Sequence, residues 1–323
     1  MLVVLRSPVL RFVLALAVIH PLAASAIECG AVLTQDTKLT SDIVCGPGQI
    51  GLIIGASGIE VDLKGHSITG PDTGALNTGG IGVFIAAPYT GVEVRSGTIQ
   101  GFGLGVRVDT TSGNTIRNLT LRDNVRGIDV ANANDNVIEK NRIEDSANDA
   151  IRLGGVSSGN LVRQNTLARN VFGLSVADDT SENTVTQNTV TAGVAFGIAV
   201  FTNGSGNEVS RNTVSGTGGD GIVVSAGALG TVVTRNESSN NGRDGVIVAA
   251  TTAGTLVDRN SATQNGDDGI DVRSAATTIS RNTASLNVDL GIEAVAGVTD
   301  GGGNVAFGNG NPLQCTGVLS VAD

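Results

Sequence analysis

The chain has 323 residues, with 46 Gly, 6 Pro, no Trp and 2 % aromatic residues. Collagen is excluded because no Gly-x-y triplet runs through the chain, and disorder is disfavoured because apolar residues recur regularly. The formal net charge of −10 argues against nucleic acid as a partner, because phosphates require a net positive face.

The first 26 residues are typical of a secretory signal peptide. Arg6 and Arg11 supply a positive start, an apolar run covers residues 12–19, and small residues at 24–26 form a cleavage site. An uncleaved membrane anchor is disfavoured because the apolar run is too short to span a bilayer. We therefore expect cleavage near Ala26, a secreted or periplasmic protein with no membrane span, and 18 basic against 30 acidic residues in the mature chain.

Two cysteines, Cys29 and Cys45, follow near the start of the mature chain. In an oxidising compartment this closely spaced pair predicts a disulfide, and residues 27–45 are expected to cap the first turn of the fold. The state of Cys315 stays open, and residues 311–323 are expected to close the other end. A cysteine-based metal site is disfavoured because no CxxC and no His cluster accompanies these residues.

A Gly-aliphatic-x-aliphatic step recurs through the chain with spacings of 22–24 residues. Its first position is occupied by Gly105, Gly127, Ala150, Gly173, Gly197, Gly221, Gly245, Gly269 and Gly291. Apolar residues that alternate with a variable residue indicate a short strand with one buried face.

Two polar columns keep the same period. One holds Asn141, Asn165, Asn188, Asn212, Asn236, Asn260 and Asn282, with Asn118 one residue out of step. The other holds Asn114, Asn136, Asn160, Asn183 and Asn207, followed by Thr231, Thr255 and Thr277. Asn suits the inner corner of a turn, because it tolerates left-handed backbone angles and its amide can bond to copies above and below.

One repeat cannot bury enough apolar surface to offset the entropy of ordering it. Coiling the chain, so that each strand pairs with its copy in the next turn, satisfies the backbone and buries a continuous aliphatic core. A leucine-rich repeat is disfavoured by too few Leu, a hexapeptide left-handed helix by its 18-residue turn, and an α/β domain by the lack of helical stretches.

The pattern Asn-x8-Gly-Ile-x-Val, over about residues 90–310, resembles the right-handed parallel β-helix repeat family. That family includes pectate-lyase-like proteins, polysaccharide C5-epimerases and the periplasmic copper-accessory protein of nitrous oxide reductase. The opening segments 39–45 and 61–70 also look like its bacterial members. The resemblance implies an all-β, single-stranded right-handed parallel β-helix over residues 46–310, with roughly 11 coils. It implies little about function, because such folds host enzymes and scaffolds alike.

An acidic column is the best candidate site. Its members precede the Gly position, and they are Asp149, Asp220, Asp244 and Asp268, with Asp267 beside the last. Carboxylates in consecutive coils repel one another, and a calcium ion would relieve this and could bridge to a uronic-acid sugar. The alternative is that Asp only shapes the turn, with Arg243 or solvent as its partner.

A basic column precedes the Asn positions, and it holds Lys140, Arg211, Arg235, Arg259 and Arg281. It could form a strip for an acidic polysaccharide. The favoured alternative is a solvated edge that protects the strands from mispairing.

Aromatic and apolar positions give two further expectations. Tyr89 is the only aromatic residue with a polar tip, and we expect Phe102, Phe172 and Phe196 to fill core or corner space, which argues against a tight glycan groove. The x positions of three consecutive coils are apolar and predict an exposed strip for a partner or for the C-terminal tail, formed by Ala199, Val223 and Ile247.

Two function classes follow. The first, which we favour, is a non-catalytic surface or periplasmic scaffold that binds an acidic polysaccharide, a cell-surface glycan or a protein partner. The second is a polysaccharide lyase or C5-epimerase that acts on uronic-acid polymers through a cation-assisted acidic site with an Arg or Lys base. A copper-accessory role is a distant third, because one His, His66, and no Met would remain after cleavage.

Overall fold

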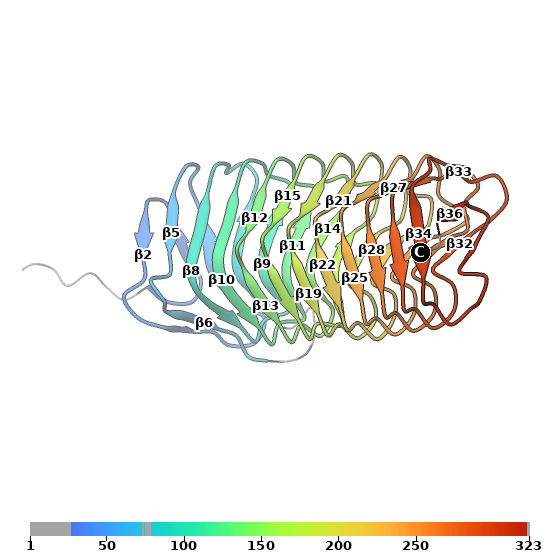
Figure 1. The fold of residues 1–323 in the computed structure, drawn as a ribbon. Helices are drawn as coiled ribbons and strands as arrows, with labels where there is room; N and C mark the ends of the chain where they lie inside the picture. The colour runs from blue at the N-terminus through green and yellow to red at the C-terminus, as the bar shows by residue number, and fades with distance from the viewer. Residues whose placement is uncertain (1–26, 73, 75–78, 322–323) are drawn as a thin grey trace, which may run out of the picture.

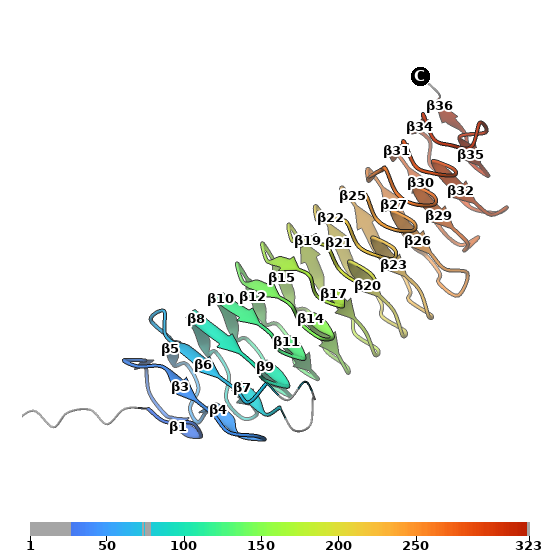
Figure 2. The same cartoon turned by 90° about the horizontal axis from the view of Figure 1, so that it is seen from below.

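The computed structural model describes residues 27–72, 74 and 79–321. These residues form a single solenoid whose coils stack along one axis from the N-terminal to the C-terminal end (Figures 1 and 2). Three strand-bearing faces surround a continuous aliphatic core. The predicted parallel β-helix is thus confirmed. The predicted signal peptide lies outside the described residues.

The first face, here called sheet A, carries the Gly-led strands, which pair in parallel. Its 13 strands are, in order of pairing, β1 (Ala31–Leu33), β4 (Ile50–Ile54), β7 (Ile81–Ala86), β9 (Leu104–Asp109), β11 (Arg126–Ala131), β14 (Asp149–Gly154), β17 (Phe172–Val176), β20 (Ile198–Val200), β23 (Ile222–Val224), β26 (Val246–Val248), β29 (Ile270–Val272), β32 (Ile292–Ala294) and β35 (Cys315–Thr316).

Two more faces complete each coil. The second contains β2 (Thr37–Lys38), β5 (Glu60–Asp62), β8 (Glu93–Gln100), β10 (Thr115–Arg122), β12 (Val137–Glu139), β15 (Leu161–Arg163), β18 (Thr184–Thr186), β21 (Glu208–Ser210), β24 (Val232–Thr234), β27 (Leu256–Asp258), β30 (Thr278–Ser280) and β33 (Thr299–Asp300). The third contains β3 (Ile43–Val44), β6 (Ser67–Thr69), β13 (Arg142–Glu144), β16 (Thr166–Ala168), β19 (Thr189–Thr191), β22 (Thr213–Ser215), β25 (Glu237–Ser239), β28 (Ser261–Thr263), β31 (Thr283–Ser285), β34 (Asn304–Phe307) and β36 (Ser320–Val321). Strands β8 and β10 are long enough to belong to both faces.

The strand register places equivalent residues of successive coils above one another. In sheet A, Ile198 pairs with Ile222 and Val200 with Val224, and all four side chains are fully buried. The variable residue between them points away from the core, as the alternation along a strand requires. The columns read from the sequence are therefore columns in space.

The Asn columns form hydrogen-bonded ladders. Both the backbone N–H and the side-chain amide of Asn141 donate to Oδ1 of Asn165 in the next coil, each at 3.0 Å. The amide also donates to the carbonyl of Ile116 in the preceding coil, at 2.9 Å. A third ladder, which the sequence did not predict, joins Asn241 to Asn265. These bonds satisfy the buried polar groups that the coil corners would otherwise leave unpaired.

One prediction for the Asn residues is wrong. The left-handed backbone angle falls on the residue before the ladder Asn, as at Arg211 (φ 54°) and Arg235 (φ 57°). Asn118 takes this position (φ 53°), while Leu119 occupies the ladder position and its N–H donates to Oδ1 of Asn141. The corner therefore bends one residue earlier than we predicted, and the ladder Asn bridges coils instead of turning the chain.

The N-terminal end is a coil of short strands, one on each face, and the C-terminal end is a partial coil of two strands. Strands β1, β2 and β3 pair with β4, β5 and β6, and a disulfide joins Cys29 to Cys45 with a Cα–Cα distance of 5.5 Å. At the other end β35 pairs with β32, and β36 pairs with β34. Within the described ranges, no helix has the length and hydrophobicity of a membrane span.

Candidate functional site

The acidic column lies at the start of the sheet A strands, and three of its members are linked through the backbone. The N–H of Asp244 donates to Oδ1 of Asp220 at 3.2 Å, and the N–H of Asp268 donates to Oδ1 of Asp244 at 3.0 Å. Oδ1 of Asp268 accepts the N–H of Leu290 at 2.8 Å. One oxygen of each carboxylate therefore bridges to the backbone of the next coil.

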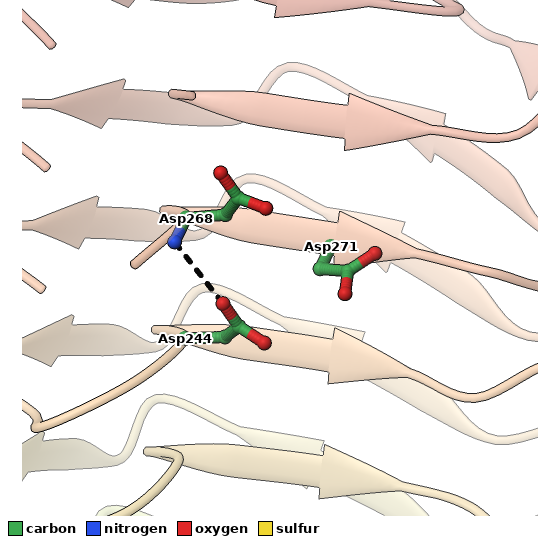
Figure 3. A group of neighbouring side chains, drawn as sticks. All are labelled: Asp244, Asp268 and Asp271. Atoms are coloured by element: carbon green, nitrogen blue, oxygen red, sulfur yellow. Dashed lines mark hydrogen bonds between the residues drawn. The ribbon is translucent and has the colours of Figure 1, made fainter. Parts of the chain in front are cut away.

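The second carboxylate oxygens form a cluster. Asp244, Asp268 and Asp271 each contribute an oxygen, and these oxygens lie within 4.8 Å of one another (Figure 3). All three side chains are buried, and Oδ2 of Asp244 accepts no hydrogen bond from any described residue. The sequence analysis did not include Asp271 in the acidic column. Two features could have indicated it: its place at the outward-facing x position, and the acidic Glu293 at the same position of the next coil.

Burial raises the pKa values of this cluster. The pKa of Asp244 rises to about 6, mainly through burial, with the charges of Asp220, Asp271 and Asp267 adding to the effect. The pKa of Asp268 rises to about 7, again mainly through burial, and a hydrogen bond with Glu293 contributes. Burial also raises the pKa of Asp271, opposed by its bond to Arg273 at 2.6 Å. The cluster can therefore take up or release protons near neutral pH.

Asp267 is exposed and lies beside this cluster. Its carboxylate oxygen approaches those of Asp268 and Asp289 within the same 4.8 Å limit. Arg243 lies at the edge of the column, with Nε 3.7 Å from Oδ1 of Asp220.

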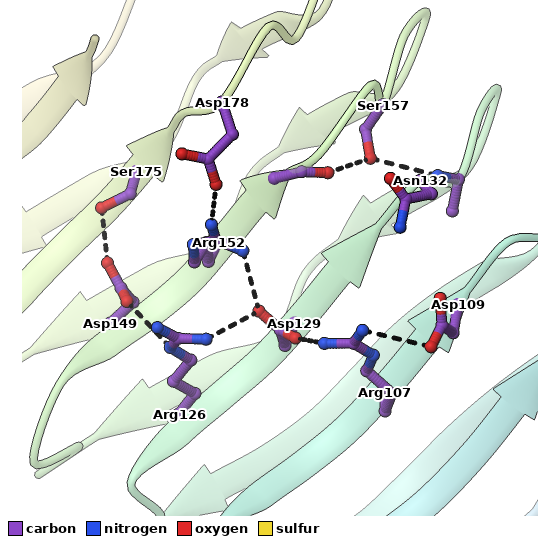
Figure 4. A network of polar contacts seen from close by, with 12 residues as sticks. Arg107, Asp109, Arg126, Asp129, Asn132, Asp149, Arg152, Ser157, Ser175 and Asp178 are labelled. Carbon is purple, nitrogen blue, oxygen red and sulfur yellow. Dashed lines mark hydrogen bonds and ion pairs between the residues drawn. The ribbon is translucent and has the colours of Figure 1, made fainter. Parts of the chain in front are cut away.

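Asp149 belongs to the same column but lies apart from the other members. In the register of sheet A it pairs with Phe172 of the next coil, and Phe172 stacks on Phe196 before the column becomes acidic again. Its Oδ2 lies 3.1 Å from Nε of Arg126, and Oδ1 accepts the hydroxyl of Ser175 (Figure 4). Burial raises the pKa of Asp149, but Ser175 and Arg126 oppose the shift.

Asp149 is the edge of an Arg–Asp network that the sequence did not predict. At its centre the fully buried Asp129 carboxylate contacts Arg107, Arg126 and Arg152 (Figure 4). Arg107 and Arg152 are the register partners of Asp129 in the preceding and following coils. Alternating charges in one column therefore neutralise one another here.

Three phenylalanines form a cluster here called the aromatic ledge, and they are Phe172, Phe196 and Phe201. Phe172 and Phe196 stack with ring centroids 4.7 Å apart, and Phe196 meets Phe201 edge-on at 6.3 Å. All three are partly exposed; Phe172 opens β17, while Phe196 precedes β20 and Phe201 follows it. Phe102 is buried in the core, as predicted. The sequence could not reveal the ledge, because the three rings meet only after the coils stack.

The predicted exposed apolar strip is wrong. Ala199 is 1 % exposed and Ile247 is 7 % exposed, while Val223 is partly buried. Phe196 and Phe201 lie on either side of Ala199 along the chain, and their rings meet edge-on. The described part of the C-terminal tail continues the solenoid, because β35 stacks on β32 at the end of sheet A.

The predicted basic strip runs along the corner between the second and third faces, away from the acidic column. Arg211, Arg235, Arg259 and Arg281 are all exposed. Two of them contact the buried Asp258 carboxylate, Arg259 at 2.8 Å and Arg281 at 2.7 Å.

Asp72 lies in the connection between β6 and β7, near the N-terminal end of the solenoid. It lines a hollow of about 270 Å³ with Gly101, Arg122 and Asp123.

The model of the right-handed β-helix family matches residues 51–214 and 202–317. The chain belongs to this family. No curated protein matches this β-helix protein.

Several solved structures share its fold. A mutant of the periplasmic alginate epimerase AlgG has 13 % identity and a TM-score of 0.62, over 89 % of this chain and 73 % of that one. The A-module of the Azotobacter vinelandii mannuronan C-5 epimerase AlgE6 has 16 % identity and a TM-score of 0.55, over 83 % and 91 %. An α-1,3-glucanase catalytic domain in complex with tetrasaccharides has 13 % identity and a TM-score of 0.58, over 89 % and 63 %. At these identities the likeness shows the fold alone.

Proposed function

We propose that this β-helix protein is an exported, non-catalytic scaffold that binds a polysaccharide along the outward side of sheet A. The observation that carries the proposal is the aromatic ledge, which lies in the same column as acidic groups. Phe172 follows Asp149, and Phe196 precedes Asp220. Sugar sites combine apolar, often aromatic, surface with a few polar groups, and carboxylates accept hydrogen bonds from sugar hydroxyls.

The shape of the face also suits an extended ligand. Sheet A runs along the length of the solenoid, and its coils repeat at about the 4.8 Å strand spacing. The structural neighbours named above as alginate epimerases and an α-1,3-glucanase support a polysaccharide as the ligand class. The signal-like residues 1–26 support export.

The proposal is tested by affinity electrophoresis in gels that contain alginate, pectin or a neutral glucan. Phe196→Ala should weaken binding at least tenfold, because it removes the ring that contacts both Phe172 and Phe201. Phe307→Ala is the matched control, because Phe307 is 37 % exposed but lies on β34 of the third face. Equal binding by wild type and Phe196→Ala, or no retardation in any gel, would contradict the proposal.

The acidic cluster favours a second candidate, a lyase or C5-epimerase acting on uronic-acid polymers. A carboxyl group that titrates near neutral pH can exchange a proton with a substrate, and Asp268 has a pKa of about 7. Double-bond absorbance would reveal a lyase, and proton NMR of alginate would reveal an epimerase. Either activity should be lost in Asp268→Asn. Absence of both products from alginate and pectin would eliminate this candidate and leave the binding function intact.

A further inference from the structure

The carboxylates of the acidic cluster use their two oxygens differently. Oδ1 of Asp244 and Oδ1 of Asp268 each hold a backbone N–H of the next coil. These bonds account for one oxygen of each residue, and they would form with any carboxylate or amide at the position. They do not account for the close approach of the remaining oxygens to Asp271.

Oδ2 of Asp244 is the cluster oxygen whose burial the protein's own hydrogen bonds do not explain. Asp244 is 0 % exposed, and this oxygen has no hydrogen-bond partner among the described residues. In Figure 3 it lies on the side of Asp244 that faces Asp271. A buried carboxylate oxygen without a donor is costly, because it loses its hydration and gains nothing in return.

The nearby arginines neutralise only one member of the cluster. Arg243 lies against Asp220, outside the cluster. Arg273 contacts only Asp271, at 2.5 Å, and its side chain is 50 % exposed. Oδ2 of Asp244 therefore faces two further carboxylates and no paired cation from the protein, in contrast to Asp129.

We propose that Asp244, Asp268 and Asp271 bind a calcium ion on the outward side of sheet A. Calcium takes oxygen ligands at about 2.3–2.6 Å, so oxygens around a single ion lie up to about 4.8 Å apart. The three carboxylate oxygens meet this condition. The donor set contains oxygen alone, which selects a hard cation over zinc or copper. Glu293 is exposed in the next coil, at the register position of Asp271, and can approach as a further ligand.

A calcium ion held by three side chains keeps coordination positions for water or for a ligand oxygen. With calcium bound, the acidic cluster would accept the carboxylate of a uronic-acid sugar. Without the ion, its negative charges would repel that carboxylate. This last step rests on the proposed function, but the cation site does not.

Calorimetric titration of calcium into the chelator-treated protein, without any glycan, tests the site. Wild type should bind calcium saturably and unfold at a higher temperature when calcium is present. Asp244→Asn and Asp271→Asn should each lower the calcium affinity at least tenfold. Asn preserves the size of the side chain, and at position 244 it can still accept the N–H of Asp268 through its amide oxygen.

Asp149→Asn is the matched control. Asp149 occupies the same column, but Arg126 already contacts its carboxylate, so its calcium affinity should equal that of wild type. Circular dichroism in chelator confirms that each variant is folded. Wild type that binds no calcium, or Asp244→Asn and Asp271→Asn proteins that bind it as wild type does, would overturn the proposal. Because no glycan is present, this result is independent of the test with Phe196→Ala.

Discussion

Asp129 and Asp271 occupy the same position of the coil in two halves of sheet A, yet their surroundings are opposite. The register neighbours of Asp129 are Arg107 and Arg152. Those of Asp271 are Ile247 and Glu293. Both carboxylates are buried, but only the first has compensating charges in the adjacent coils. Asp271 pairs instead with Arg273 of its own coil, while the cluster around it gains no positive charge from the adjacent coils.

The largest expected effect comes from removing the central carboxylate of the Arg–Asp network. Asp129→Asn should lower the free energy of unfolding by about 3–5 kcal/mol, because it leaves three guanidinium groups without their shared partner. Urea unfolding provides the measurement. Arg169→Ala, which breaks the exposed pair with Asp145, is the control and should cost at most about 1 kcal/mol. Equal effects of the two variants would contradict the network's role.

The acidic cluster should make the free energy of unfolding depend on pH in the opposite direction from carboxylates that are paired with a basic side chain. The folded state holds protons on Asp244 up to about pH 6 and on Asp268 up to about pH 7, whereas an unfolded Asp releases its proton near 3.8. The folded state therefore binds more protons between about pH 4 and pH 7. In chelator, the contribution of Asp244 and Asp268 to the free energy of unfolding should fall by several kcal/mol as pH rises through this window. Urea unfolding at pH 5 and pH 8 checks the sign, and equal or greater stability at pH 8 would refute it.

Asp244→Asn should have the opposite sign to Asp129→Asn. In chelator at pH 8, it removes a buried negative charge that faces two others, and we expect a gain of about 1–2 kcal/mol in the free energy of unfolding. At pH 5 the wild-type carboxyl is already protonated, so the gain should nearly vanish. A destabilised variant at pH 8 would show that the charge is compensated by a group outside the cluster.

The smallest effect concerns the ladder that changes from Asn to Thr along the solenoid. The hydroxyls of Thr231, Thr255 and Thr277 are buried and have no hydrogen-bond partner among the described residues. Thr255→Val should therefore leave the free energy of unfolding unchanged or raise it by less than about 1 kcal/mol. Asn183→Val is the comparison and should be clearly destabilising, because Asn183 accepts two hydrogen bonds from Asn160. A marked loss in Thr255→Val would indicate an ordered partner for that hydroxyl.

Much of the fold could be predicted because the repeat is explicit. The column of Ile198, Ile222, Val246 and Ile270 read from the sequence is the column that the strands pair. The acidic residues at 220, 244 and 268 could likewise be aligned by period. Asp271 and the aromatic ledge could not be found this way, because their contacts join different positions of the coil or depend on how far a side chain reaches across it.

The sequence by itself determined the period, the buried face of each strand and the stacking of equivalent residues, because a repeat of 22–24 residues can bury its aliphatic side only against its own copies. The tertiary structure alone decided which side chains of different columns meet. It separated Asp149 from Asp244, buried Ala199, and brought Asp271 against Asp244. These outcomes follow from side-chain direction across adjacent coils, where the same position has arginine neighbours at Asp129 and has Ile247 and Glu293 as neighbours at Asp271.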